Sequence, residues 1–92
     1  MVYKIPEHIT WKALKSGIVQ LNVKNGNYYT LNPTASEIWE NIIAKKKREE
    51  IISNLCEIYD CTTKQAEIDI DKTLTFLTAE GLLEGKNITN KK

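Results

Sequence analysis

The chain has 92 residues, of which 41% are hydrophobic and 27% are charged, and its formal net charge is +1 at pH 7. This length supports one small domain with a single core and leaves no room for a buried catalytic cleft with its supporting structure. The nearly balanced charge excludes a strong field for nucleic acid or anionic membranes, and the lack of a signal peptide or an apolar run of roughly 18 residues predicts a cytoplasmic protein without a membrane partner.

The N-terminal third predicts a small antiparallel sheet. Its expected strands are residues 9–14, 18–23 and 28–31. In the second of these, Val19, Leu21 and Val23 share one face, with mostly polar residues on the other, which is the period-2 pattern of a half-buried strand. Asn25 and Gly26 then form the dipeptide that most strongly indicates a hairpin turn. The resulting order is a three-stranded meander.

The rest of the chain predicts three helices, at about residues 33–44, 49–59 and 62–80. Asn32 can cap the first of them with Pro33 in its first turn, whereas Thr34 and Glu37 offer a competing capping box. The third helix stops at a glycine, and the two leucines that follow are expected to fold back onto the core. We expect one domain over residues 1–84 and a polar, disordered tail over residues 85–92.

The third helix has two groups of side chains that deserve separate interpretation. A continuous core stripe is formed by Ala66, Ile70, Leu74 and Leu77. The second group lies beside it and consists of Ile68, Asp69, Lys72, Thr75, Phe76 and Ala79. This second group either widens the core stripe or lines one wall of a groove.

No arrangement of residues indicates catalysis, a cofactor or a metal. The single histidine, His8, has no evident catalytic partner, and no phosphate-binding loop is present. Cys56 falls in an apolar stripe and Cys61 precedes a helix cap, and this pair with one histidine is too few ligands for a metal site. The basic run at residues 45–48 is either a solvated charge cluster or a phosphate contact.

The order of the hairpins places the first and third strands at the edges of the sheet. The outer N–H and C=O groups of the third strand are then free to pair with an added strand. If the third helix lies beside this edge, the two form a trough in which an extended peptide pairs with the backbone and packs against Phe76 and its neighbours. A proline at Tyr29 is expected to weaken such strand addition.

The chain resembles the PqqD-like family, the small domains called RiPP recognition elements. The similarity rests on Tyr28-Tyr29-Thr30-Leu31-Asn32 followed by Ala35, Ile38 and Trp39, then on Arg48-Glu49-Glu50-Ile51-Ile52 with Leu55, Tyr59 and Asp60, and finally on Phe76-Leu77 and Gly81-Leu82-Leu83. It spans about residues 8–84. The basic run at residues 45–48 departs from the pattern, because relatives often have a short Asp-Gly-type turn there.

This resemblance implies an α+β, winged-helix-like fold with an N-terminal three-stranded sheet followed by three helices. It implies a non-catalytic adaptor that binds the leader segment of a ribosomally synthesised precursor peptide and presents it to a modifying enzyme, such as a radical SAM enzyme or a lasso-peptide protease and cyclase. The peptide would add to the third strand beside the third helix. The expected peptide-binding residues are Tyr28, Tyr29, Thr30, Leu31, Ile68, Asp69, Lys72, Thr75, Phe76 and Ala79.

Two other functions compete with this interpretation. The second and third helices can mimic the helix-turn-helix of a DNA-binding winged helix, although Glu67, Asp69 and Asp71 would repel phosphate. Alternatively, the protein is a structural subunit or a homodimer that pairs through its third strand. The expected state is a monomer or a weak homodimer, with no nucleic-acid partner.

Overall fold

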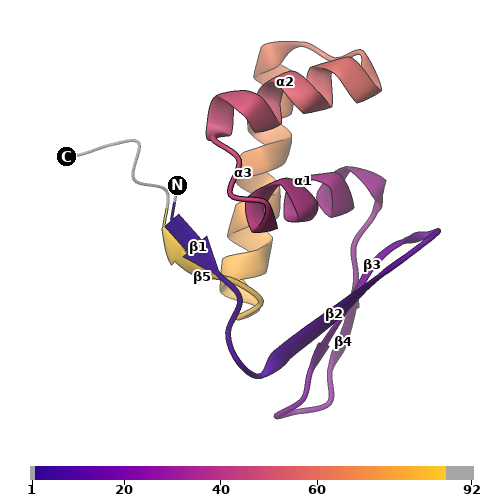
Figure 1. Cartoon of the computed structure of the whole chain (residues 1–92), viewed down its shortest axis with the longest axis vertical. Coiled ribbons are helices and arrows are strands. Elements are labelled where there is room, and N and C mark those ends of the chain that lie inside the picture. Colours follow the sequence, from indigo (N-terminus) through magenta and orange to yellow (C-terminus); the bar gives the residue numbers. More distant parts are fainter. Residues whose placement is uncertain (1, 87–92) are drawn as a thin grey trace.

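The computed structural model describes residues 2–86, in which three helices and five strands follow one another as β1-β2-β3-β4-α1-α2-α3-β5 (Figure 1). The strands are Val2–Lys4 (β1), Ile9–Leu14 (β2), Gly17–Asn22 (β3), Tyr28–Thr30 (β4) and Glu84–Lys86 (β5), and the helices are Pro33–Ile43 (α1), Arg48–Tyr59 (α2) and Thr63–Ala79 (α3). An antiparallel sheet has the order β2-β3-β4. The predicted α+β, winged-helix-like fold is confirmed.

A second, two-stranded sheet was not expected from the sequence. β1 pairs with β5 in antiparallel fashion, with Tyr3 opposite Gly85, and this sheet lies apart from the three-stranded one (Figure 1). The expectation of a disordered tail from residue 85 is therefore wrong for the first two of its residues, which belong to β5. The rest of that tail, residues 87–92, lies outside the described residues.

The three-stranded sheet turns the face opposite to the expected one toward the helices. In β3 the buried residues are Ile18, Gln20 and Asn22, whereas Val19 is half-buried and Val23, just after the strand, is 56% exposed. A half-buried strand normally turns its more apolar face inward. In β3 the opposite face is turned inward, because of the contacts of the neighbouring strand β2.

The cause of this orientation is the contact between β2 and α1. Trp11 of β2 meets Trp39 of α1 edge to face, with ring centroids 6.0 Å apart. Trp11 also lies directly opposite Gln20 in the sheet, and opposite residues of an antiparallel pair share one face. The tryptophan contact therefore carries Gln20 into the interior and leaves Val19 and Leu21 on the outer face.

The core lies between this sheet and the three helices. The predicted stripe of α3 is confirmed, because all four of its members are buried, and the two leucines after α3 also fold back into the core as expected. α1 contributes Ile38 and Trp39, and α2 contributes Ile51 and Leu55. Cys56, which falls in the apolar stripe of α2, is half-buried at the margin of this core.

The helix ends show which of the predicted caps are used. Asn32 Oδ1 accepts a hydrogen bond from the Ala35 N–H at 2.8 Å, so Asn32, and not Thr34, caps α1. Thr62 Oγ1 accepts from the Gln65 N–H at 3.1 Å and caps α3. The chain therefore leaves β4 and enters α1 within two residues, as the sequence predicted.

The basic run at residues 45–48 connects α1 to α2. Lys45 has a left-handed backbone with φ of 64°, and Arg48 Nη2 forms an ion pair with Asp71 Oδ1 of α3 at 3.0 Å. Nearby, burial raises the pKa of the Tyr3 hydroxyl, while Arg48 lowers it and Asp71 raises it further. The ion pair of Arg48 with Asp71 therefore links α2 to α3, so at least one member of the run is more than a solvated charge.

Candidate functional site

The order of the sheet leaves β4 at one edge, and no strand within residues 2–86 pairs with its outer side. Two hydrogen bonds establish which groups point outward: Leu31 N–H donates to Ile18 O at 2.8 Å, and Asn22 N–H donates to Asn27 O at 3.0 Å. In an antiparallel ladder, residues with such bonds alternate with residues whose backbone groups face away. The inward bonds therefore belong to the pairs that contain Leu31, Tyr29 and Asn27.

The backbone groups of Tyr28 and Thr30 consequently face the open edge. Tyr28 lies opposite Leu21, and Thr30 lies opposite Val19. The alternation places no backbone hydrogen bonds within these two pairs. This corrects the expectation for a proline at Tyr29, because the Tyr29 N–H points toward Gln20 and not toward an added strand. The positions at which a proline would remove an outward donor are Tyr28 and Thr30.

Helix α3 lies beside this open edge and is joined to it by Tyr29. The Tyr29 and Phe76 rings meet edge to face with centroids 6.3 Å apart, and the Tyr29 hydroxyl donates to Glu80 Oε1 at 3.3 Å. An aromatic pair of this kind typically contributes about 0.5 to 1.5 kcal/mol beyond its buried area. The predicted proximity of the third strand and the third helix is therefore present.

An open pocket of about 280 Å³ lies where β4 ends, between the strand and α3. It is lined by Thr30, Leu31, Asn32, Ala35, Lys72, Thr73 and Phe76. We call the outer edge of β4, this pocket and the side of α3 that carries Lys72, Phe76 and Glu80 the β4–α3 groove. Leu31 forms its floor and is only 3% exposed.

The structure brings some of the sequence-predicted residues into this groove and leaves others beside it. Lys72 and Phe76 line the pocket together with Thr30 and Leu31. Ile68, which is 39% exposed, lies one turn before Lys72 and is not among the residues that line the pocket. The remaining members are Tyr28, Thr75 and Ala79, which are exposed, and Asp69, which accepts a hydrogen bond from Gln65.

Four residues of the groove were not predicted from the sequence: Asn32, Ala35, Thr73 and Glu80. Asn32 and Ala35 were visible as the cap and first turn of α1, which continue directly from the strand. Thr73 and Glu80 depend on how α3 is rotated about its axis, and no local pattern indicates that rotation. Glu80 did have one signal, because an acid at the end of a helix is unfavourable.

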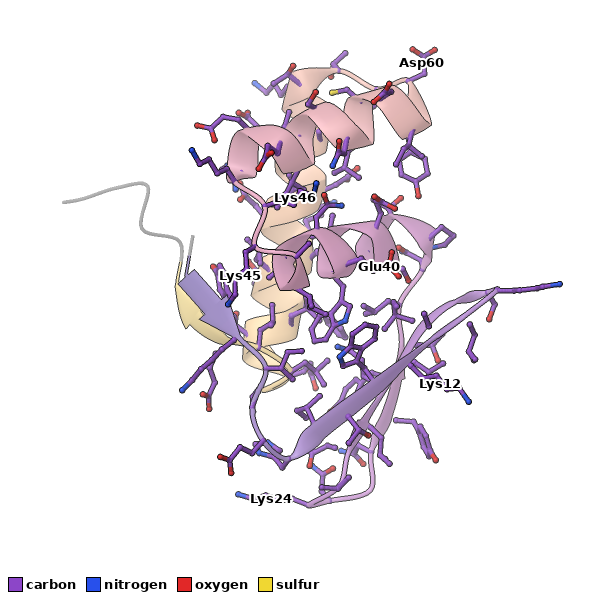
Figure 2. The ribbon with its side chains drawn as sticks, viewed as in Figure 1. Lys12, Lys24, Glu40, Lys45, Lys46 and Asp60 are labelled. Carbon is purple, nitrogen blue, oxygen red and sulfur yellow. The ribbon has the colours of Figure 1, made fainter. Side chains whose placement is uncertain are left out.

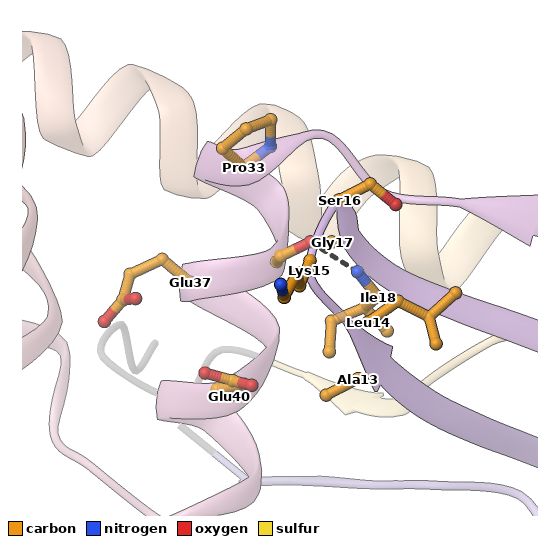
Figure 3. A pocket seen from close by; sticks show the side chains of 10 residues that line it. Ala13, Leu14, Lys15, Ser16, Gly17, Ile18, Pro33, Glu37 and Glu40 are labelled. Atoms are coloured by element: carbon orange, nitrogen blue, oxygen red, sulfur yellow. Dashed lines mark hydrogen bonds between the residues drawn. The ribbon is translucent and has the colours of Figure 1, made fainter.

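A second pocket, of about 210 Å³, lies between the tip of the β2–β3 hairpin and α1 (Figure 3). Ile18 N–H donates to Ser36 Oγ at 2.9 Å along its wall, and Glu37 and Glu40 of α1 are among the lining residues. Within residues 2–86, no group of three or more His, Cys, Asp or Glu side chains is placed to hold a metal ion.

The outer face of the sheet is a shallow apolar surface with lysines at its margin. A hollow of about 470 Å³ there is lined partly by Leu14, Val19 and Leu21. Lys12 projects away from the helices, and Lys24 projects from the β3–β4 turn (Figure 2). Across the described part of the chain, no helix combines the length and the apolar character that crossing a membrane requires.

Taken together, the open strand and its helical wall define a winged-helix-like domain built to expose one edge of its sheet. The chain belongs to the PqqD family, because the model for that family, described as coenzyme PQQ synthesis protein D, matches residues 17–83. The match begins at β3 and ends just after α3, so it contains β4, the groove and every buried hydrophobic residue of the core except Ile9. No curated protein sequence matches the chain.

Two solved structures are similar to the whole fold. TbiB1 in complex with the TbiA(beta) leader peptide is 28% identical, with a TM-score of 0.82, over 91% of this chain and 98% of that one. A lasso peptide synthetase B1 complexed with the leader peptide is 24% identical, with a TM-score of 0.83, over 90% of this chain and 98% of that one. The second likeness establishes the fold alone.

Proposed function

We propose that this protein binds an extended segment of a precursor peptide, which adds to the sheet as a strand on β4. The observation that carries the proposal is the outward row of backbone groups on Tyr28 and Thr30, next to the apolar wall of Phe76. Backbone pairing supplies affinity, and side chains that pack against α3 supply selectivity. The protein acts as a non-catalytic adaptor that presents the bound peptide to a modifying enzyme.

Membership of the PqqD family and the similarity to TbiB1, whose structure contains a leader peptide, support this proposal. The partner enzyme would be a peptide-modifying enzyme of the radical SAM or lasso protease and cyclase type, acting in the cytoplasm. The exposed acids Glu67 and Asp71 on α3 count against the DNA-binding alternative, because a recognition helix must approach phosphates.

The proposed peptide contacts combine the expected residues with those that the structure adds. They are Tyr28, Tyr29, Thr30, Leu31, Asn32, Ala35, Ile68, Asp69, Lys72, Thr73, Thr75, Phe76, Ala79 and Glu80. Among these, Thr30 and Phe76 provide the sharpest test, because one acts through its backbone and the other through its side chain.

The test titrates the protein with the N-terminal segment of a precursor peptide encoded beside it and follows amide shifts by NMR. We expect shifts at residues 28–32 and along α3, and we expect Thr30→Pro to weaken binding at least about tenfold by removing one outward donor. Shifts that avoid both segments, or full affinity in folded Thr30→Pro, would contradict the proposal.

A second variant, Tyr29→Pro, tests the assignment of inward and outward donors through stability, because Tyr29 itself belongs to the groove. It removes a donor that faces β3, so we expect it to lower the free energy of unfolding, whereas Thr30→Pro leaves the β3–β4 bonds in place. Analytical ultracentrifugation at several concentrations, with and without peptide, tests the alternative of a homodimer that pairs through β4. Such a dimer would occupy the same edge as the peptide, so it would dissociate when peptide is added.

A further inference from the structure

The end of α3 breaks a general rule of helix stability beside the groove. The last turn of α3 contains no basic residue, and the residue that caps it is the acid Glu80. The C-terminal carbonyls of a helix carry a partial negative charge, which a nearby acid reinforces and a cation offsets. A rule broken without local compensation commonly marks a functional position.

Glu80 finds no cation within the described part of the chain, where the single ion pair is the one between Arg48 and Asp71. Its carboxylate instead accepts the hydrogen bond from the Tyr29 hydroxyl at 3.3 Å, which holds it at the groove. This end of the groove therefore combines a carboxylate with the negative end of a 17-residue helix.

The opposite end of the groove carries the opposite charge. Lys72 lines the pocket beside Leu31 and Asn32, and no carboxylate among residues 2–86 forms an ion pair with it. Asp69, one turn before Lys72, accepts a hydrogen bond from Gln65 and does not line the pocket, so the pocket is positive where β4 ends, whereas the groove is negative near Tyr29. An extended peptide lying in it meets these two charges in a fixed order.

The spacing of the helix matches the spacing of one face of a strand. Lys72, Phe76 and Glu80 follow one another at four-residue intervals, so they lie on one side of α3 and span about 12 Å. Residues i and i+4 of an extended strand lie on one face about 13 Å apart, with i+2 between them. One guest residue can thus meet each of the three side chains.

The direction of the guest follows from the pairing of β4. Tyr29 lies beside Glu80 while Asn32 lies near Lys72, so β4 runs opposite to α3. All strand pairs in residues 2–86 are antiparallel, and antiparallel pairing is slightly more stable per residue than parallel pairing. A guest that is antiparallel to β4 runs along α3 from Lys72 to Glu80.

We propose that the β4–α3 groove selects its peptide by charge order. The selected segment carries an acidic residue at i beside Lys72, an apolar residue at i+2 on Phe76, and a basic residue at i+4 beside Glu80. This inference rests on the proposed function and names the class of peptide that the groove accepts.

The test is a selection from a displayed library of random 12-residue peptides. Binders are retained only if they fail to bind Thr30→Pro, so that they report on the β4 edge. With the wild-type protein we expect acid-x-apolar-x-base to be enriched, and with the double variant Lys72→Glu and Glu80→Lys we expect the two charges to exchange places. The matched control exchanges Lys64 and Glu67, which are exposed on α3 outside the groove, and should leave the motif unchanged.

Two synthetic peptides then measure the size of the effect. They share one selected sequence and differ only in the exchange of its acidic and basic residues. We expect the acid-first peptide to bind wild type about three- to tenfold more tightly, with the preference shrinking in 1 M salt, where charges are screened within about 3 Å.

Equal affinity of the two peptides, or a preference that survives the charge exchange in the protein, overturns the charge-order inference and leaves the proposed function intact. A selection that yields no peptide sensitive to Thr30→Pro overturns both.

Discussion

Gly17 lies so close to Leu31 that a Cβ atom on Gly17 would be 2.5 Å from the Leu31 carbonyl oxygen and 3.0 Å from Ser36 Oγ. The start of β3 is thus pressed against the point where β4 leaves the sheet for α1. Both the floor of the groove and the first turn of α1 depend on this contact, because Ser36 Oγ also donates to the Leu31 carbonyl at 3.2 Å.

We therefore expect Gly17→Ala to lower the free energy of unfolding by at least about 2 kcal/mol, since the methyl group meets backbone and φ is unfavourable for a side chain. The φ of Gly17 is +134°. Urea denaturation measures the change. Gly26→Ala is the matched control, because its φ of +78° is also positive but nothing lies within 4 Å of the added atom. A cost at Gly17 no larger than at Gly26 would show that the close approach is unimportant.

Asn32 and Thr34 offered two alternative caps for α1, and the structure uses Asn32. We expect Asn32→Ala to lower the free energy of unfolding by about 1 kcal/mol through loss of the bond to the Ala35 N–H. Thr34→Ala should change stability by less than half of that amount. Thermal unfolding of both variants measures the two losses of stability. A larger loss for Thr34→Ala than for Asn32→Ala would show that Thr34, and not Asn32, caps α1.

Phe76 is 42% exposed and contacts Tyr29, so its side chain serves the groove more than the core. We expect Phe76→Ala to weaken peptide binding about tenfold or more while lowering the free energy of unfolding by only about 1 kcal/mol. Isothermal titration and urea denaturation measure the two effects. Ile58→Ala, at an exposed site on α2, should leave affinity unchanged; if it matched Phe76→Ala, the groove would not be the binding surface.

Gln20 is completely buried, and neither atom of its side-chain amide has a hydrogen-bond partner within the described residues. A buried amide without partners costs about 1 to 3 kcal/mol. We therefore expect Gln20→Leu, which has a similar volume, to leave the melting temperature unchanged or to raise it. A clear fall in melting temperature would show that the amide makes a stabilising bond.

The closeness of β4 and α3 was predictable because both elements have strong local patterns. An aromatic and β-branched strand that runs into Asn32-Pro33 indicates both the strand and the helix start, and the four-residue stripe of α3 indicates which side faces the core. Hairpin order alone places β4 at an edge.

The inward face of β3 could not be predicted in the same way, because this strand has apolar residues on both faces. Ile18 lies on one face, and Val19 and Leu21 lie on the other. The contact of Trp11 with Trp39, between segments distant in the sequence, determines which of these faces is turned toward the helices. The β1–β5 sheet escaped prediction for a different reason, since strands of three residues contain too few positions to show a period.

The ladder that β4 offers ends at Pro33, which has no N–H group and begins α1. A guest chain can therefore be held by main-chain bonds only across a short window that closes at Asn32. Outside that window the rest of the guest forms no backbone hydrogen bonds with the sheet. A long chain can therefore bind and dissociate laterally at the open edge, without being threaded through the protein.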